Sequence, residues 1–197
     1  VELRDTAVEA ARAAGAIHLE HFGASPAVDR LHAHDIKLAA DRLSESAIVE
    51  VIRRAFPDHA IHSEECGDLP GSNDHVWWID PLDGTMNFSQ GLHYFCSCVA
   101  CYRRPPAAPA EACVPPAGAN AASLGEPVVG VVYAPALEEL FVGVRGQGAT
   151  RNGAPLRVAQ VGRLGDAVVA VSLGSEEATM ARMLEIVSVL LRRCRKL

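Results

Sequence analysis

Two aspartates, Asp80 and Asp83, follow an apolar run in the stretch VWWIDPLDGTMNFSQG, which spans residues 76 to 91. Pro81 lies between them and fixes a turn, and Gly84 permits backbone angles that other residues avoid. Two carboxylates held close together repel and shift each other's pKa unless a cation lies between them. Hard oxygen ligands of this kind suit Mg²⁺ or Mn²⁺. The stretch therefore indicates a divalent cation site, or else an Asx-type turn that only satisfies local hydrogen bonds.

Thr85 and Asn87 follow the two aspartates and are placed to begin a helix. The first N–H groups of a helix have no partners within it, which makes a helix N-terminus a natural cradle for phosphate. A cation and a phosphate group would then share one loop.

Other acidic residues stand at comparable places in the chain. Glu64 and Glu65 follow a short apolar run and precede Gly67, so adjacent acids again sit at the end of an expected strand. Asp41 comes just before the second expected helix, where an N-cap is the simpler interpretation and is compatible with a catalytic role. These acids favour the cation site over the simple turn.

The spacing of apolar residues predicts the elements that position these acids. Helical spacing predicts one helix over residues 2 to 22, a second from about Arg42 to Phe56 and a last one from about Glu177 to Arg195. Short apolar runs predict strands at Ala60–His62, Val76–Ile79, Phe95–Tyr102, Val128–Tyr133, Glu139–Val144 and Ala167–Val171. The turn that carries Asp80 and Asp83 is expected at the end of the strand Val76–Ile79, because Pro81 cannot continue a ladder.

Turn signals organise these strands. Pro135 joins two runs into an expected hairpin, and Asn152-Gly153 is a strong signal for a tight turn. Residues 103 to 127 are rich in Pro and Ala and are expected to form an excursion from a hairpin tip. We expect an α/β fold, an α+β layered sandwich in which two N-terminal helices pack on a mostly antiparallel sheet with the site at one sheet edge.

Composition excludes several classes of protein. The 197 residues carry 18 Lys and Arg against 24 Asp and Glu, a net charge of −6, so nucleic acid is not an expected partner. No run of eighteen apolar residues is present, so no membrane span is expected, and no signal peptide is visible at the start, where the chain opens on Val1. The six cysteines fit no small disulfide scaffold, which points to a reducing cytoplasm.

Three of the cysteines, Cys96, Cys98 and Cys101, come close enough in sequence to suggest a zinc cluster. In a strand, however, Cys96 and Cys98 share one face and Cys101 falls on the other. Buried thiols that act as small apolar side chains are the preferred interpretation.

Three stretches in this order resemble the inositol monophosphatase family, within the lithium-sensitive, magnesium-dependent phosphatase superfamily. They are DIKLAAD (Asp35 to Asp41), HSEECG (core Ser63 to Gly67) and WIDPLDGTMNF (Trp78 to Phe88), the last matching the specific signature D-P-[ILV]-D-G-T-x-N-[FY]. Later stretches, GEPVVGVVYAP, ELFVGVRGQGATRNGAPLRV and SLGS, are also similar, so the resemblance covers the chain apart from residues 103 to 127.

The resemblance implies a role for each matching residue. Glu64 and Asp80, with the backbone carbonyl of Leu82, would hold a first Mg²⁺, and Asp80 and Asp83 a second, within a site of two or three ions in which Mn²⁺ is possible. Glu65 would position water at the metal, and Asp41 and Thr85 would orient and activate the attacking water. The residues implied to contact the substrate are Glu64, Leu82, Asp83, Gly84 and Thr85.

Departures from the family pattern leave these ligands in place. Leu38 and His93 stand where the family usually has threonine and proline, and Arg30 keeps the charge of a family lysine. The family continues into a second α/β region whose Trp-Asp motif completes the second metal site. We expect that region to be absent here, so that residues 1 to 197 form an N-terminal metal-binding phosphatase domain and the second site lacks one ligand.

The resemblance implies a Mg²⁺-dependent phosphomonoesterase that acts on inositol 1-phosphate or a similar small polyol phosphate, inhibited by lithium and commonly dimeric. Related activities remain open, namely those of fructose-1,6-bisphosphatase, histidinol-phosphatase or 3′-phosphonucleotide phosphatase. A non-catalytic, regulatory family member is a third interpretation, because some bacterial relatives act in transcription complexes.

Overall fold

The computed structural model describes residues 2–23, 28–32, 35–104, 125–171 and 177–196. The chain forms two units, Val1–Leu156 and Arg157–Leu197, each with its own internal packing. The predicted excursion at residues 103 to 127 lies mostly outside the described residues.

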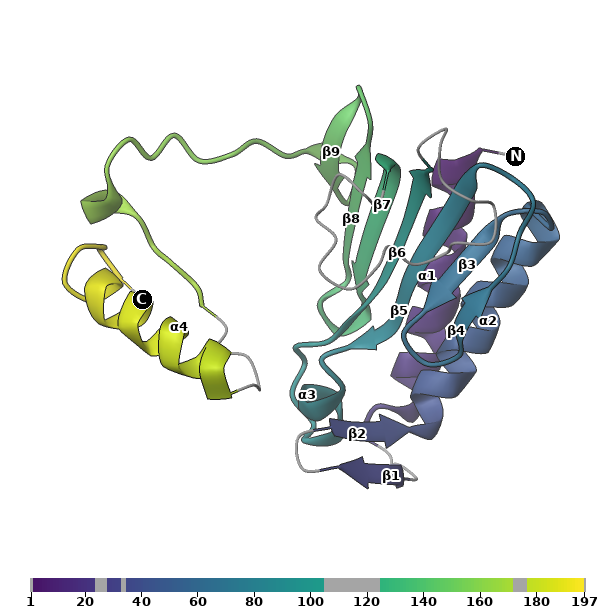
Figure 1. The fold of residues 1–197 in the computed structure, drawn as a ribbon, viewed down its shortest axis with the longest axis horizontal. Coiled ribbons are helices and arrows are strands. Elements are labelled where there is room, and N and C mark those ends of the chain that lie inside the picture. Colours follow the sequence, from purple (N-terminus) through teal and green to yellow (C-terminus); the bar gives the residue numbers. More distant parts are fainter. Residues whose placement is uncertain (1, 24–27, 33–34, 105–124, 172–176, 197) are drawn as a thin grey trace. The chain divides into compact units, whose positions relative to one another are not determined.

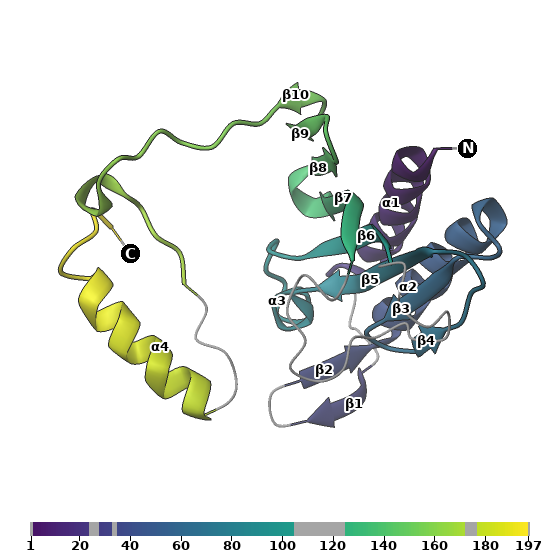
Figure 2. The same ribbon diagram turned by 45° about the horizontal axis from the view of Figure 1, so that its top comes forward.

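Two long helices of the first unit pack on one face of its sheet (Figures 1 and 2). Helix α1 spans Leu3–His21 and buries a stripe of alanines, and helix α2 spans Ala39–Ala55 and buries an amphipathic face. Alanine side chains let a helix approach its neighbours closely. The buried positions of the α1 stripe are Ala7, Ala10, Ala11 and Ala14.

Eight strands form the sheet, in the order β10-β9-β8-β7-β6-β5-β3-β4. Every neighbouring pair is antiparallel except β3 and β5, which run parallel. A separate ribbon pairs β1 (Val28–His32) with β2 (Asp35–Leu38). The strands of the sheet are β3 (Ala60–Ser63), β4 (Gly67–Leu69), β5 (His75–Asp83), β6 (Cys96–Arg103), β7 (Glu126–Ala134), β8 (Glu139–Val144), β9 (Gly148–Arg151) and β10 (Ala154–Pro155).

The core lies between the two helices and the sheet. Alternate residues of β5 and β6 point into it, and Trp77 is completely buried there. Its indole Nε1 donates a hydrogen bond of 3.0 Å to Nδ1 of His59, so the ring is satisfied as well as packed. Trp78, the next residue, is half-buried and packs against His62 at a ring distance of 4.3 Å. The two neighbouring tryptophans thus lie on opposite faces of β5.

Both predicted turns are confirmed. Strands β7 and β8 form the hairpin through a 3₁₀ turn at Pro135–Leu137. Asn152 and Gly153 join β9 to β10 with φ angles of 49° and 81°, which is the pair of left-handed residues that a type I′ turn needs. Arg103 and Glu126 are paired across β6 and β7, so residues 104 to 125 connect two adjacent antiparallel strands.

Two predicted boundaries were wrong. Helix α2 begins at Ala39 and not near Arg42, and β5 continues to Asp83 and does not end before Pro81. The ladder between β5 and β6 is irregular between Asp80 and Asp83, so Pro81 lies where no donor is required. The site is therefore at the end of an interior strand and not at an edge strand.

The second unit contains little regular structure. A 3₁₀ turn spans Leu164–Asp166 and helix α4 spans Glu177–Leu190, shorter than the predicted helix. The strand predicted at Ala167–Val171 is wrong, because that segment forms only an isolated bridge between Val168 and Lys196. Among the described residues of both units, no helix is long and apolar enough to cross a membrane.

Candidate functional site

The ends of β3, β5 and β6 bring the predicted acids together. Ser63, the last residue of β3, is paired with Ile79 of the parallel strand β5, and the N–H of Glu64 donates to the carbonyl of Ile79 at 3.4 Å. Glu64 therefore enters its turn beside the residue that precedes Asp80. Ligands commonly bind beyond the carboxyl ends of parallel strands, where such turns meet.

A bulge at the end of β5 separates the two aspartates. Asp80 is paired with Cys98, and Asp83 with Cys96, so two residues of β5, Pro81 and Leu82, lie opposite a single residue of β6, which leaves β5 with one extra residue. Both Pro81 and Leu82 are buried. A bulge of this kind bends the strand and redirects side chains, and here it turns Asp83 outward to solvent while Asp80 stays half-buried.

Asp80 is the most perturbed carboxyl of the group. Burial, together with the nearby charges of Glu64 and Asp83, raises its pKa to about 7, and Glu64 is also within hydrogen-bonding reach. One of its oxygens, Oδ1, is buried and has no hydrogen-bond partner. A buried oxygen without a partner is costly, and a cation would satisfy it and reverse the shift of the pKa.

Gly84 shapes the start of helix α3, which spans Thr85–Ser89. Its φ of 83° is left-handed, and a Cβ there would lie 2.7 Å from the carbonyl oxygen of Tyr94. Thr85 Oγ1 donates to the carbonyl of Leu82 at 2.9 Å, and Asn87 Nδ2 donates to that of Tyr94 at 2.8 Å. Side chains of the signature thus hold the turn and the start of α3 in place, and only glycine fits at position 84.

Asp41 lies in the first turn of α2 and is buried. The predicted N-cap role is wrong, because the helix already begins at Ala39. Ala40 packs with Leu82, Phe88 and Phe95 in one apolar cluster, so the start of α2 rests on the bulge of β5. The tertiary contacts therefore bring Asp41 to the neighbourhood of the signature.

Glu45 is a site residue that the sequence analysis missed. It is buried on α2, accepts a short hydrogen bond from Ser63 Oγ and accepts the N–H of Cys66 at 2.9 Å. These bonds clamp both sides of the turn that carries Glu64 and Glu65, the latter half-buried. A signal was present, since Glu45 follows Asp41 by one helical turn on the face that carries the apolar residues.

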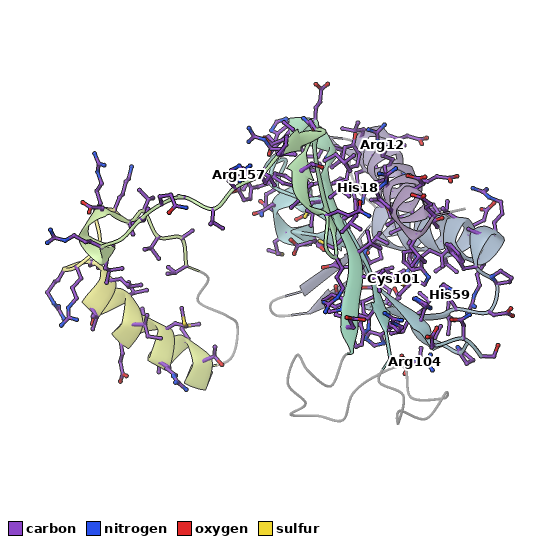
Figure 3. All side chains as sticks on the ribbon, turned by 90° about the horizontal axis from the view of Figure 1, so that it is seen from above. Arg12, His18, His59, Cys101, Arg104 and Arg157 are labelled. Carbon is purple, nitrogen blue, oxygen red and sulfur yellow. The ribbon has the colours of Figure 1, made fainter. Side chains whose placement is uncertain are left out.

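His18 of α1 closes the cluster from the other side. Its ring is completely buried and makes edge contacts with Phe88 and Phe95, at ring distances of 6.2 and 5.8 Å. Burial lowers the pKa of His18 to about 4, so the imidazole is neutral at pH 7. In Figure 3 this side chain lies between α1 and the sheet. It supports the signature helix through packing.

The carboxylates are neighbours but do not yet surround one point. Within the described ranges, no group of three or more His, Cys, Asp or Glu side chains is arranged to hold a metal ion. Glu64 and Asp83 are exposed and can change rotamer, and the Leu82 carbonyl keeps a second lone pair beside its bond from Thr85. Hard oxygens around an unsatisfied Asp80 fit a divalent cation after such an adjustment.

Two cysteines stand beside the acids. Cys96 Sγ lies 3.6 Å from Asp83 Oδ2 and 3.9 Å from Cys98 Sγ. Their contact raises the pKa of Cys96 and lowers that of Cys98. Cys101 is buried on the opposite face, so the predicted alternation is confirmed, but Cys96 and Cys98 are half-exposed and not the buried thiols expected.

Comparisons with known proteins all point to the same family. The model of the inositol monophosphatase family matches residues 1–107 and 120–196. Inositol monophosphatase 3 of Solanum lycopersicum is 32% identical over 175 residues, 87% of this chain and 58% of that protein. The Nus factor SuhB of Escherichia coli K12 is 36% identical over 154 residues, 77% of this chain and 50% of that protein. The chain thus spans about half the length of these curated relatives.

Solved structures share the fold. The extragenic suppressor protein suhB of Bartonella henselae superposes with a TM-score of 0.81 at 28% identity, covering 98% of this chain and 67% of that one. The inositol monophosphatase of Thermotoga maritima gives 0.74 at 29% identity, covering 98% and 65%. The expected α/β architecture and the family resemblance are both confirmed, and the chain belongs to the inositol monophosphatase family.

Proposed function

We propose that this chain carries the metal-binding half of a Mg²⁺-dependent phosphomonoesterase whose substrate is inositol 1-phosphate or a similar small polyol phosphate. One observation carries the proposal. Glu64 and Asp80, sixteen positions apart in the chain, meet within hydrogen-bonding reach beside Asp83, and a buried oxygen of Asp80 is left without a partner. Acids gathered at this cost point to a cation that offsets their repulsion.

The proposed ligands are those that the family resemblance implies. Glu64, Asp80 and the carbonyl of Leu82 would hold one Mg²⁺, and Asp80 and Asp83 would hold a second. Bound cations of this kind cancel phosphate charge and lower the pKa of water. The backbone N–H groups of Gly84 and Thr85 would bind oxygen atoms of the substrate phosphate beside that centre.

The remaining residues would position water and the turn that carries Glu64 and Glu65. Asp41 and Thr85 would orient and activate the attacking water, and Glu65 would position water at the cation. Glu45 fixes the turn of Glu64 and Glu65 through its bonds to Ser63 and the Cys66 N–H. Because phosphoryl transfer depends on positioning and electrostatics more than on covalent chemistry, these placements are the protein's main contribution.

The test is phosphate release from inositol 1-phosphate by the 197-residue chain, with and without Mg²⁺. We expect release only with Mg²⁺, and a loss of at least about a hundredfold in Asp80→Asn, which keeps the shape but removes the charge. The matched control is Asp74→Asn, the same substitution beside the other end of β5, with unchanged release. Metal-independent release, or full activity in Asp80→Asn, would contradict the proposal. A panel of fructose 1,6-bisphosphate, histidinol phosphate and a 3′-phosphonucleotide would rank the related activities.

A non-catalytic role is the second candidate, because several relatives carry the name Nus factor SuhB. The acids weigh against it, since a scaffold has no need of a half-buried carboxylate near two others. Calorimetry decides between the two. A folded chain that binds no Mg²⁺ would favour the regulatory role.

A further inference from the structure

Cys96 and Cys98 form a pair of thiols on the face of β6 that also carries the acidic turn. Both are half-exposed, and their sulfur atoms are 3.9 Å apart. Cys96 Sγ is in addition 3.6 Å from Asp83 Oδ2. Two sulfurs and a carboxylate oxygen therefore follow one another at nearly equal spacing along the β5–β6 ladder.

These two separations are close to two of the edges of a tetrahedral zinc site. With Zn–S bonds of about 2.3 Å and Zn–O bonds of about 2.0 Å, tetrahedral angles put two sulfurs about 3.8 Å apart and a sulfur and an oxygen about 3.5 Å apart. The two observed distances, 3.9 and 3.6 Å, differ from these values by about 0.1 Å each. A Mg²⁺ site would not use the sulfurs, because Mg²⁺ prefers oxygen ligands.

A disulfide explains the pair less well. Cys96 and Cys98 are two positions apart on one strand, and successive residues on one face of a strand lie about 6.5 to 7 Å apart. A disulfide needs Cβ atoms about 3.5 to 4.5 Å apart, which β6 could reach only by leaving its ladder. A metal ion placed between the sulfurs spans the same gap without moving the backbone.

We propose that Cys96, Cys98 and the carboxylate of Asp83 form a binding site for a thiophilic divalent cation of the Zn²⁺ class. Two of the three ligand separations are near tetrahedral values, but the described side chains do not form a ready group of three, so the exposed Asp83 stays beside Cys96 and turns toward Cys98 on binding. The ion bonds two thiolates and one carboxylate oxygen, water completes the coordination, and the two thiol protons pass to solvent.

The site shares Asp83 with the proposed Mg²⁺ centre. A Zn²⁺ ion held there removes Asp83 from that centre. Because Asp80 is paired with Cys98 across the strands, the Zn²⁺ charge also lies close to Asp80 and disfavours binding of Mg²⁺ there. Zn²⁺ would thus inhibit hydrolysis. This consequence rests on the proposed function, whereas binding of the ion does not.

Binding is tested on the reduced 197-residue chain, with Cd²⁺ as a spectroscopic probe and Zn²⁺ in calorimetry. Cd²⁺ bound to thiolates gives an ultraviolet charge-transfer band that oxygen ligands do not give. We expect one tight equivalent with this band in the unmodified chain. Cys96→Ser and Cys98→Ser should each lower the affinity at least about tenfold and lower the band. Cys194→Ser, a control thiol in the second unit, should leave both unchanged.

Two results would overturn the site: no thiolate band in the unmodified chain, or the same band and affinity in both serine variants. If a serine variant does not fold, Cys98→Val, which keeps an apolar side chain of similar size, replaces it. Hydrolysis provides a separate readout, in which Cys98→Ser keeps Mg²⁺-supported activity and needs at least about ten times more Zn²⁺ for inhibition. A chain that shows the Cd²⁺ band but no hydrolysis would refute the proposed function and leave the cation site intact.

Discussion

The two faces of the β5–β6 ladder are built from the same strands and serve opposite purposes. On the face under α1 and α2, Trp77 and Cys101 are completely buried. On the other face, Asp80 and Cys98 are half-buried and directly paired. Since a strand alternates its side chains, one sequence supplies both faces, residue by residue.

The difference shows how stability and chemistry are kept apart. The covered face holds apolar groups whose removal from water stabilises the fold. The other face holds charges and thiols whose proximity costs free energy, as the raised pKa of Asp80 shows. Substitutions on the covered face should therefore lower stability broadly, and substitutions at the acidic turn should act locally.

The largest effect is expected on the covered face. Trp77→Ala removes a completely buried ring and leaves His59 Nδ1 without its donor, so the free energy of unfolding should fall by about 3–5 kcal/mol. Urea denaturation followed by circular dichroism measures it. Trp78→Ala, one residue away on the other face, is the matched control and should cost clearly less. Equal losses would remove the distinction between the faces.

The second-largest effect is expected from acid, which should lower the stability of the fold through two buried histidines. The pKa values of buried His18 and His59 are about 4 in the folded chain, against 6.5 for a free histidine. The unfolded state binds protons first, so stability present at pH 7 is lost as the pH falls from about 6.5 to 4, by about 2–3 kcal/mol per histidine. Figure 3 labels both side chains within the first unit.

Melting temperatures between pH 7 and pH 4 test this acid sensitivity. His18→Leu, which keeps an apolar side chain of similar volume among Phe88 and Phe95, should flatten the curve. Parallel curves for the variant and the unmodified chain would show that His18 does not contribute.

Gly84→Ala should affect the acidic turn by a smaller amount. A left-handed φ and the 2.7 Å approach to the Tyr94 carbonyl together should cost about 2 kcal/mol. Gly91→Ala has a similar φ of 71° but nothing within 4 Å of its Cβ, so it isolates the backbone strain and should cost about 1 kcal/mol. If Gly91→Ala costs as much as Gly84→Ala, the close approach is irrelevant.

The smallest effect is expected at the clamp of Glu45. Ser63→Ala removes one of the two hydrogen bonds that Glu45 accepts and should cost about 1 kcal/mol. Ser46→Ala is the control, because exposed Ser46 only bonds the carbonyl of Arg42 within its own helix. A fall in Mg²⁺ affinity in the first variant alone would show that the clamp positions Glu64.

The strands and helices with clear periods were predictable because each obeys a local rule. Helix α1, the β7–β8 hairpin and the Asn152-Gly153 turn depend on residues that are neighbours in sequence. The failures occur where distant contacts override local preference. Pro81 interrupts a ladder in general, yet the bulge opposite Cys96 and Cys98 lets β5 continue past it. The β1–β2 ribbon and short strand β4 carried no apolar run from which to predict them.

The sequence by itself determined the chemistry: acids, a glycine that permits a left-handed turn, and a signature specific enough to indicate a phosphatase family. Only the tertiary structure decided which of these groups meet. Parallel pairing of β3 with β5 brings Glu64 to Asp80, and the bulge turns Asp83 outward to Cys96. Packing of α2 places Glu45 against the turn that carries Glu64. Local spacing fixes the type of a side chain and its face, but convergence of residues far apart in the chain depends on packing that no single segment encodes.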